Sequence, residues 1–399
     1  MPCPQDVARV MKICIVTEYY YPLLGGISEH VHNTGLQLLR MGHEVWIITS
    51  SQKRDDGNGH YWPDQSPFNI VRIGRGCRVR ANGSMASMTL GFSNLWTQMR
   101  GLMLKEQFDI VHVHSPLVPT LPPIGILAAP CPSVATFHTY FDYRRVYSVL
   151  RHVLQRRFLD KLDGQIAVSQ SCLRALEPYF QMNARIIPNG IDLDTFSPGA
   201  PKLPKYDDGR LNLLFLSRLE PRTGLDLMLQ AFEIIKRQRP DVRLVVVGDG
   251  QRRSEYELMV PRASAHDVDF VGPMLAERAS YYRTADVYCA PISTASFGMT
   301  LLEAMATGTP IVATENDGYR DLLGPDEGIL VPHGDPQHFA NAILTLLANK
   351  DRRTKMGQAG LAKAAQYAWP KVTEQVISFY EEILSRPRRT PGAPPDGPR

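Results

Sequence analysis

The chain has 399 residues, of which 44% are hydrophobic and 21% are charged. This length exceeds one typical hydrophobic core and predicts two domains, while the apolar fraction excludes disorder over most of the chain. The 44 Lys and Arg residues nearly balance 40 acidic ones, which argues against a general nucleic-acid binder. The net charge of +4 lies entirely in residues 1–200, which contain 19 basic and 15 acidic residues.

The cysteines and the chain start bear on the compartment. Six cysteines are spread along the chain without a C-x-x-C pair, a pattern typical of neither a disulfide framework nor a zinc site. No secretory signal is recognisable at the start, and the longest apolar stretch, 116–132, contains six prolines. We therefore expect a cytoplasmic protein that crosses no membrane, although it could lie on the inner face of one.

The first half of the chain alternates buried strands with helices. Strands are predicted at 12–17 and 44–49, with a helix from about 27 to 41 between them. Further strands are predicted at 108–114, 133–137 and 164–168. Strand–helix–strand units of this kind imply a parallel sheet with right-handed crossovers.

A polar, proline-containing stretch from 197 to 209 is predicted to link two domains. A second alternating series follows, with strands predicted at 212–216, 243–247, 269–271, 287–290 and 310–313. The fold class is therefore α/β, with two doubly wound domains over 11–195 and 205–370 that face each other across a cleft. A last helix at 371–385 is expected to return to the first domain, and residues 386–399 are expected to form a disordered tail.

Two glycines follow the first predicted strand. Gly25 and Gly26 precede the first helix, where backbone without side chains lets amide groups approach an anion. A plain strand-to-helix turn explains the pair equally well. The dinucleotide fingerprint G-x-G-x-x-G does not occur here, which weakens a dehydrogenase interpretation.

The second half contains a denser set of motifs. Ser217-Arg218-Leu-Glu-Pro-Arg222-Thr223-Gly224 separates a strand from a helix, and Val247-Gly-Asp-Gly250 ends the next strand. The segment from Ser296 to Pro310 predicts a loop, a short helix and a strand. Free amides at the start of such a helix suit a diphosphate. Glu303, one turn later, could accept hydrogen bonds from ribose hydroxyls, or it could simply stabilise the helix.

The order of these motifs resembles the retaining glycosyltransferases of family 4, which have the two-Rossmann GT-B fold. The resemblance spans about 12–384 and looks closest to the phosphatidylinositol mannosyltransferase branch. It is carried by Gly25-Gly26-Ile27, Thr136-Phe-His138-Thr139, Pro188-Asn-Gly-Ile-Asp192, Arg218, Phe297-Gly298 and Glu303 with the Ala-Met-Ala that follows.

The resemblance implies a hexosyltransferase that moves mannose or glucose from a GDP- or UDP-sugar to an acceptor, such as a phospholipid headgroup. The configuration would be retained by same-face attack, and no prosthetic group would be needed. The first domain would meet the acceptor, and His138 would be the catalytic residue. The donor would contact Gly25, Gly26, Arg218, Thr223, Pro273, Met274, Ala295, Phe297, Gly298, Met299, Thr300, Leu301 and Glu303, the last holding the ribose.

The sequence departs from the family at two donor-site positions. Ala295 replaces the first glutamate of an E-x7-E pattern, and Thr223 replaces the lysine usual beside the diphosphate. Each lost charge-assisted contact is worth about 1.5–3 kcal/mol, so impaired turnover is one expectation. A non-catalytic sugar-nucleotide-binding protein is the alternative, while an epimerase of similar fold has no support in the sequence.

Two motifs resemble metal ligands. Asp192-Leu-Asp194 matches a D-x-D pattern, but it follows a Pro-Asn-Gly turn, where capping explains the aspartates better. His112 and His114 share one face of a strand. Because no third ligand follows at a convincing spacing, no metal site is predicted.

The segment 143–161 is basic and amphipathic, with six Lys or Arg residues and one acidic residue, Asp160. Apolar residues recur in it at helical spacing: Val146, Leu150, Val153, Leu154 and Phe158. It is either the solvated face of a domain helix or a patch for anionic lipid headgroups. The basic residues expected in such a membrane or acceptor patch are Arg144, Arg145, Arg151, Arg156 and Arg157.

Overall fold

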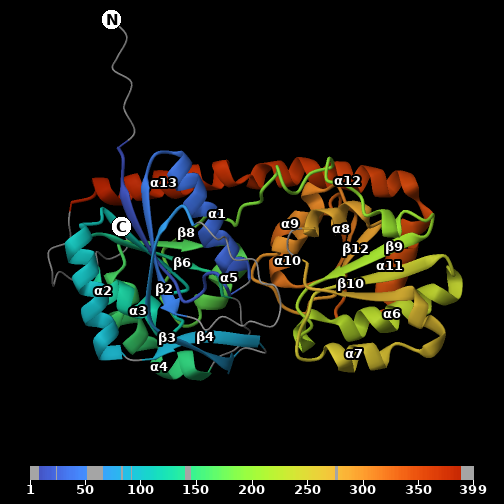
Figure 1. Cartoon of the computed structure of the whole chain (residues 1–399), viewed down its shortest axis with the longest axis horizontal. Coiled ribbons are helices and arrows are strands. Elements are labelled where there is room, and N and C mark those ends of the chain that lie inside the picture. Colours follow the sequence, from blue (N-terminus) through green and yellow to red (C-terminus); the bar gives the residue numbers. More distant parts are fainter. Residues whose placement is uncertain are drawn as a thin grey trace, which may run out of the picture.

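A computed structural model describes residues 9–23, 25–51, 66–81, 84–90, 92–139, 145–274 and 277–387. Two sheets organise these residues, one in each half of the molecule (Figure 1). The first sheet has the strand order β4-β3-β2-β1-β5-β6-β7-β8. Its strands are β1 (Lys12–Val16), β2 (Glu44–Ser51), β3 (Asn69–Ala81), β4 (Ser84–Leu90), β5 (Ile110–His114), β6 (Ser133–Phe137), β7 (Gly164–Ala167) and β8 (Ala184–Ile186).

The second sheet is parallel throughout and has the strand order β11-β10-β9-β12-β13-β14. Its strands are β9 (Leu211–Leu216), β10 (Val242–Val247), β11 (Val268–Gly272), β12 (Val287–Ala290), β13 (Ile311–Thr314) and β14 (Ile329–Val331). The central strands are short apolar runs that are buried along their length, as in β10. Burial of this kind is what a sheet covered on both faces requires.

Helices cover both sheets. Those of the first half are α1 (Gly26–Arg40), α2 (Phe92–Glu106), α3 (Leu121–Ala128), α4 (Arg145–Arg157) and α5 (Gln170–Leu176). Those that follow are α6 (Leu225–Gln238), α7 (Arg253–Met259), α8 (Arg278–Thr284), α9 (Met299–Ala306), α10 (Asp317–Leu322), α11 (Pro336–Ala348), α12 (Lys350–Ala364) and α13 (Trp369–Ser385). None of the helices in the described ranges has the length and apolarity needed to cross a bilayer.

The strand order reverses next to β1 in the first sheet and next to β9 in the second. In open parallel sheets, ligands bind beyond the carboxyl ends of the strands at such a reversal. The predicted glycines Gly25 and Gly26 follow β1, and Arg218 follows β9. The topology therefore brings the two predicted motif groups to the functional edge of their sheets.

One edge of the first sheet contradicts the expectation of an all-parallel arrangement. β3 pairs in parallel with β2, but β4 returns antiparallel to β3. Neither strand was predicted from the sequence, because arginines and glycines interrupt the apolar pattern of 69–81. Asn82-Gly83, a pair typical of hairpins, separates the two strands.

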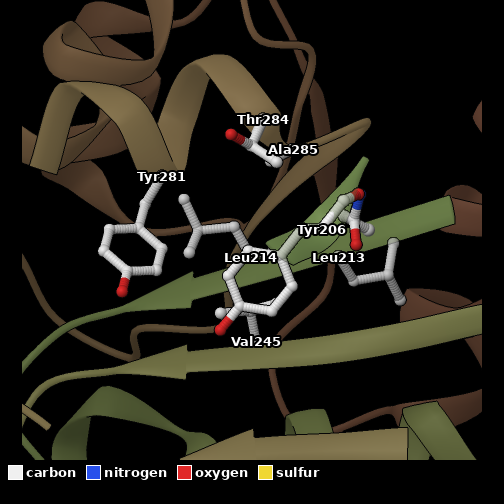
Figure 2. A pocket seen from close by; sticks show the side chains of 8 residues that line it. Tyr206, Leu213, Leu214, Val245, Tyr281, Thr284 and Ala285 are labelled. Carbon is white, nitrogen blue, oxygen red and sulfur yellow. The ribbon is translucent and has the colours of Figure 1, made fainter. Parts of the chain in front are cut away.

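The stretch predicted to be a linker, 197–209, packs closely against the second sheet. It contains a 3-10 helix at Pro204–Tyr206, and the Tyr206 side chain is buried. The Tyr206 hydroxyl donates to Asp269 Oδ2 at 2.7 Å. Figure 2 shows its ring beside a small pocket that is lined mainly by apolar side chains of β9, β10 and α8. This pocket lies at the linker rather than at the strand ends that carry the predicted motifs.

The last helix crosses to the first half of the molecule. α12 and α13 run along one edge, at the top of Figure 1, and α13 lies against α1. The buried side chains that α13 adds to the core of β1, β2 and β5 are Trp369, Val372, Val376, Phe379, Tyr380 and Ile383. Residues 388–399, most of the predicted tail, lie outside the described residues.

The two halves contact each other through α5 and the loop before α9. The Ser171 hydroxyl donates to the Ser296 carbonyl at 2.9 Å, and the Ser169 hydroxyl also bonds this carbonyl. The Ser171 amide and the Arg174 guanidinium donate to the carboxylate of Asp321 on α10, at 2.6 and 2.9 Å. Polar contacts from the first half therefore hold the loop that contains the predicted donor residues.

Candidate functional site

The site is built where the start of α1 faces the start of α9. A Cβ added to Gly26 would lie 3.7 Å from Met299 Cγ, so residues of the two halves approach one another here. A Cβ added to Gly25 would meet no described atom within 4 Å. The described chain therefore leaves room beside Gly25, which is what the close approach of a ligand requires.

Four histidines lie together on the first-half side. His112 and His114 end β5, His138 follows β6, and His30 lies one turn into α1. Nδ1 of His114 is 3.0 Å from Nε2 of His138. Nδ1 of His30 is 2.8 Å from the side-chain oxygen of Asn189, so this nitrogen carries a proton and Nε2 keeps its lone pair.

Burial keeps these histidines neutral. It lowers the pKa of His30 to about 4, although the hydrogen bond to Asn189 opposes this shift. Burial also lowers the pKa of His138 far below its usual value, and the charges that His30 and His112 would carry add to the effect. His138 is partly exposed, while His114 is fully buried. His138 therefore offers a neutral imidazole that can orient a hydroxyl group but adds no positive charge.

Three of these rings form a group that could hold a metal ion. One nitrogen each from His30, His114 and His138 lies within 4.8 Å of the others. Three neutral imidazoles are a donor set that suits zinc. His112 is not part of this group, because both its ring nitrogens contact hydroxyls, Tyr380 at 2.5 Å and Thr136 at 2.7 Å, as expected of a residue that was not predicted to bind a metal.

Arg218 and Arg222 lie in the loop after β9. Both contact the carboxylate of Glu220, Arg218 through Nη1 at 3.2 Å and Arg222 through Nε at 3.4 Å. Each guanidinium is partly exposed. Burial lowers the pKa of Arg218 below its usual value, and the nearby charge of Arg222 lowers it further. The loop therefore brings two cations together where the resemblance predicts one Arg and one missing Lys.

Thr223 does not replace the missing lysine. Its side chain is buried, and its hydroxyl contacts the carbonyl oxygens of Arg218 at 2.8 Å and Glu220 at 2.6 Å. It therefore stabilises the loop that presents Arg218 rather than facing a ligand. Gly248 supports the same loop from β10, since its φ of 139° suits glycine and a Cβ there would lie 1.9 Å from the Ser217 carbonyl oxygen.

The helix α9 begins beside the glycines of α1. Gly298 has a φ of 130°, and an added Cβ would crowd the Tyr319 ring at 3.1 Å. The helix begins at this glycine, so the amides of Met299 and Thr300 belong to its first turn. Amides of a first turn have no carbonyl partner within the helix. Leu301 is buried and anchors the turn in the core. The arrangement fits an anion at the helix start.

Glu303 lies on α9 and is 1% exposed. Its Oε1 is 3.1 Å from Nη1 of Arg278, which also lies 3.0 Å from Oε1 of Glu29 on α1. Burial raises the pKa of Glu303, and the Arg278 charge opposes that shift. Glu303 Oε2 is buried without a hydrogen-bond partner among the described residues.

The other predicted donor residues lie in two loops. Pro273 and Met274 follow β11, where Pro273 is exposed and Met274 packs against the core. Ala295 and Phe297 precede α9, and the Phe297 ring is buried 6.0 Å from that of Tyr367. The carbonyl of Ala295 lies against Gly318, because a Cβ there would approach this oxygen to 2.3 Å.

The basic segment forms α4, whose side chains divide into two groups. Leu154 and Phe158 pack against the core, while Leu150 and Val153, of the same predicted apolar set, are exposed. Val149 is 77% exposed and Val153 is 61% exposed. Arg151, Arg156 and Arg157 are also exposed. Arg144 lies outside the described residues, and only the backbone of Arg145 and Val146 is described.

The D-x-D aspartates have the structural role expected of them. Oδ1 of Asp192 accepts from the amides of Asp194 and Thr195 at 3.0 and 3.3 Å, and Oδ2 accepts from the Thr195 hydroxyl at 2.6 Å. Asp192 therefore caps a turn, and the capping interpretation is confirmed.

Three residues of the site were missed in the sequence. His30 lies four positions after Gly26, a spacing that puts both on one side of α1 and could have drawn attention to it. Glu29 and Arg278 meet only through the packing of the two halves, and no local pattern marks either one. Their contact depends on residues 249 positions apart in the chain.

Two family models match the chain. The model "Glycosyltransferase Family 4" matches residues 24–195, and "Glycosyl transferases group 1" matches residues 201–363. The phosphatidyl-myo-inositol mannosyltransferase of Mycobacterium leprae is 34% identical over 383 residues, which cover 94% of this chain and 98% of that protein. Its counterpart from Mycolicibacterium smegmatis is 32% identical and covers 94% of both chains.

Solved structures agree in fold. Anabaena Alr3699/HepE in complex with UDP superposes with a TM-score of 0.75 at 18% identity, over 93% of this chain and all of that chain. WaaG, a glycosyltransferase involved in lipopolysaccharide biosynthesis, has a TM-score of 0.67 at 15% identity and covers 92% of this chain and 99% of its own. Nothing in these relatives supports a non-catalytic sugar-nucleotide-binding protein. The chain is a glycosyltransferase of the GT-B fold and belongs to family 4, in the branch of the phosphatidyl-myo-inositol mannosyltransferases.

Proposed function

We propose that the protein transfers a mannosyl residue from a nucleotide diphosphate sugar to the headgroup of a phosphatidylinositol lipid, with retained configuration. The observation that carries this proposal is the approach of Gly26 on α1 to Met299 at the start of α9. Two helix N-termini that lie this close together suit a diphosphate. The mannosyltransferase names of relatives that match over 94% of the chain support the choice of sugar and acceptor.

The donor would lie with its diphosphate between these helix starts and its ribose at Glu303. Arg218 and Arg222 would stabilise the charge that collects on the diphosphate as the glycosidic bond breaks. Arg222 lies beside Arg218, and its charge lowers the pKa of Tyr319, although burial raises that pKa more. The Tyr319 ring in turn packs on Gly298. Arg222 would therefore supply the cation that Thr223 does not.

In the transfer step, an acceptor hydroxyl would form a bond to the anomeric carbon on the face from which the diphosphate departs. The leaving phosphate oxygen would take the hydroxyl proton, so the reaction needs positioning more than a strong base. The neutral ring of His138 would orient the sugar through a hydrogen bond. Its hydrogen bond to His114 holds the ring in place.

The test is to incubate the protein with GDP-, UDP- or ADP-mannose and vesicles that contain phosphatidylinositol. Formation of a mannosylated lipid with release of the nucleoside diphosphate is expected, and the anomeric configuration follows from the proton spectrum of the product. Replacing mannose by glucose in each donor tests the sugar. If calorimetry shows that a nucleotide sugar binds but no nucleoside diphosphate is released, the proposal is contradicted and the non-catalytic alternative is favoured.

We propose further that α4 holds the protein at the inner face of a membrane as a peripheral protein. Exposed Val149 and Val153 on a helix that also exposes Arg156 and Arg157 fit a surface of anionic lipids, since apolar side chains can enter the headgroup layer while arginines pair with phosphates. A lipid acceptor would then reach the site from that surface.

Flotation with anionic vesicles tests this role. The Arg156→Gln, Arg157→Gln double variant is expected to lose much of the binding, because each basic residue near such a surface contributes about 1 kcal/mol. The matched control is Arg352→Gln, Lys355→Gln on α12, which also removes two exposed charges. Binding that is insensitive to salt and equal in both double variants would rule out the α4 patch.

A further inference from the structure

Arg278 connects both halves of the molecule. It begins α8, and its Nη1 lies 3.0 Å from Glu29 on α1 and 3.1 Å from Glu303 on α9. Its guanidinium also lies over the Phe196 ring, 5.5 Å from the centroid, in the segment that joins the halves. One partly buried cation therefore contacts three segments that come together only in the folded molecule.

The carboxylate of Glu303 needs this cation. A carboxylate that is 1% exposed stays ionised in a protein interior only if charges and hydrogen bonds replace the lost water. Arg278 contacts Oε1 at 3.1 Å, and both Oε2 and the hydroxyl of the neighbouring Tyr282 are buried without a hydrogen-bond partner among the described residues. A buried acceptor of this kind costs free energy unless a donor reaches it, and a ribose hydroxyl is a donor of the right chemistry.

Four ionisable groups face Glu303 from the elements around it. Arg278 and Tyr282 lie on α8, Glu29 lies on α1, and Tyr288 lies on β12. Burial and the negative charge of Glu29 raise the pKa of Glu303, whereas Arg278 and the Tyr282 hydroxyl lower it. Burial raises the pKa of Glu303 to about 7 even with Arg278 in place, so loss of the Arg278 charge raises it further, leaves the carboxyl more protonated at neutral pH and reduces its capacity to accept hydrogen bonds.

We propose that Arg278 is a positioning residue that ties α1 to α9 through Glu29 and orients Glu303 so that its free oxygen receives the donor ribose. The proposal rests on the proposed function, because it assumes that a nucleoside diphosphate sugar occupies this site. If Arg278 has this role, the contact between the two halves and the recognition of the ribose depend on the same side chain.

Calorimetric binding of UDP and GDP between pH 6 and pH 9 tests the Glu303 contact. Arg278→Gln is expected to weaken the preferred nucleotide about tenfold or more at pH 7, with partial recovery toward pH 9 as Glu303 ionises. Arg278→Lys keeps the charge and is expected to keep most of the affinity and the pH profile of the parent. A loss through disturbed packing alone would be independent of pH. Arg239→Gln, which removes a surface ion pair with Asp241, is the matched control.

Small-angle scattering of the nucleotide-free protein tests the tie. Arg278→Gln and Glu29→Gln are both expected to increase the radius of gyration, whereas Arg239→Gln leaves it unchanged. Affinity of Arg278→Gln within twofold of the parent at every pH, or an unchanged radius in both tie variants, would overturn the proposal. If Arg278→Gln does not fold, the scattering of Glu29→Gln still tests the tie, and the nucleotide affinity of Arg278→Lys still tests the contact with Glu303. If the parent binds neither nucleotide, the proposed donor is wrong, and scattering alone still decides the tie.

Discussion

The two sides of the site differ in charge. On the first-half side, His30, His114 and His138 are neutral rings that contact one another. On the second-half side, Arg218 and Arg222 are partly exposed cations beside one glutamate. A neutral sugar needs orientation and a diphosphate needs charge, so in the proposed function the histidines would orient the sugar and the arginines would stabilise the diphosphate.

The largest effect is expected where the neutral side meets the sugar. His138→Ala should lower kcat by roughly 10²–10³, because a contact made in the transition state is lost while the diphosphate contacts remain. Nucleotide affinity should stay within about twofold, since truncation of a neutral ring changes no charge. Steady-state kinetics and calorimetry check both values, with the exposed His333→Ala as control. A loss of nucleotide affinity equal to the loss of rate would erase the proposed division.

The charged side should behave in the opposite way. Arg218→Gln should weaken nucleotide binding about tenfold to a hundredfold, because a hydrogen bond between charged groups is worth about 1.5–3 kcal/mol. The Arg218 side chain is 49% exposed, so its pair with Glu220 adds little to stability. Calorimetry and thermal unfolding of the same variant separate the two quantities. A lower melting temperature with unchanged affinity would show that Arg218 is only structural.

Acid should destabilise the protein through the histidine side. Unfolded histidines take up protons below pH 6.5, whereas His30 stays neutral in the fold down to about pH 4. Each buried histidine should therefore make its full contribution to the free energy of unfolding above pH 6.5. As the pH drops below 6.5, the free energy of unfolding should fall by up to about 1.4 kcal/mol per pH unit for each buried histidine. Urea unfolding at pH 7, 6 and 5 measures the slope. His30→Gln should reduce this slope, the exposed His266→Gln should not, and equal stability at pH 7 and pH 5 would contradict the argument.

The smallest effect is expected from restoring a family residue on the charged side. Ala295→Glu adds the carboxylate that the E-x7-E pattern lacks and should raise kcat several-fold. Thr223→Lys should not help, because the buried Thr223 hydroxyl holds the loop carbonyls of Arg218 and Glu220. Comparing the turnover of both single variants with the parent checks this. A gain from Thr223→Lys alone would mean that Arg222 does not supply the missing cation.

The sequence was most informative where a feature is local. The strand at 133–137 and the helix after Gly26 follow from short apolar patterns and a glycine turn, and the structure contains both. β3 was missed because arginines and glycines interrupt its apolar pattern, and β4 was missed because a strand at the sheet edge needs no continuous apolar run. The length and position of α9 were also predictable, since Gly298 and Gly308 flank it.

Contacts between distant segments could not be predicted in the same way. His30 meets His138 only because α1 packs over the ends of β5 and β6, and Arg278 meets Glu29 only because the halves touch. The role of Thr223 was also hidden, since a hydroxyl that caps its own loop has the same sequence as one that faces a ligand. Such information lies in the packing of whole elements rather than in spacing along the chain.

The path of α13 has a consequence for the order in which the protein folds on the ribosome. The side chains of Trp369, Phe379 and Tyr380 complete the core around β1, the first strand among the described residues. That core therefore stays partly uncovered until α13 has been translated. Contacts this distant in sequence slow folding and prolong exposure of apolar surface, so the first half depends on the last residues of the second for protection from aggregation.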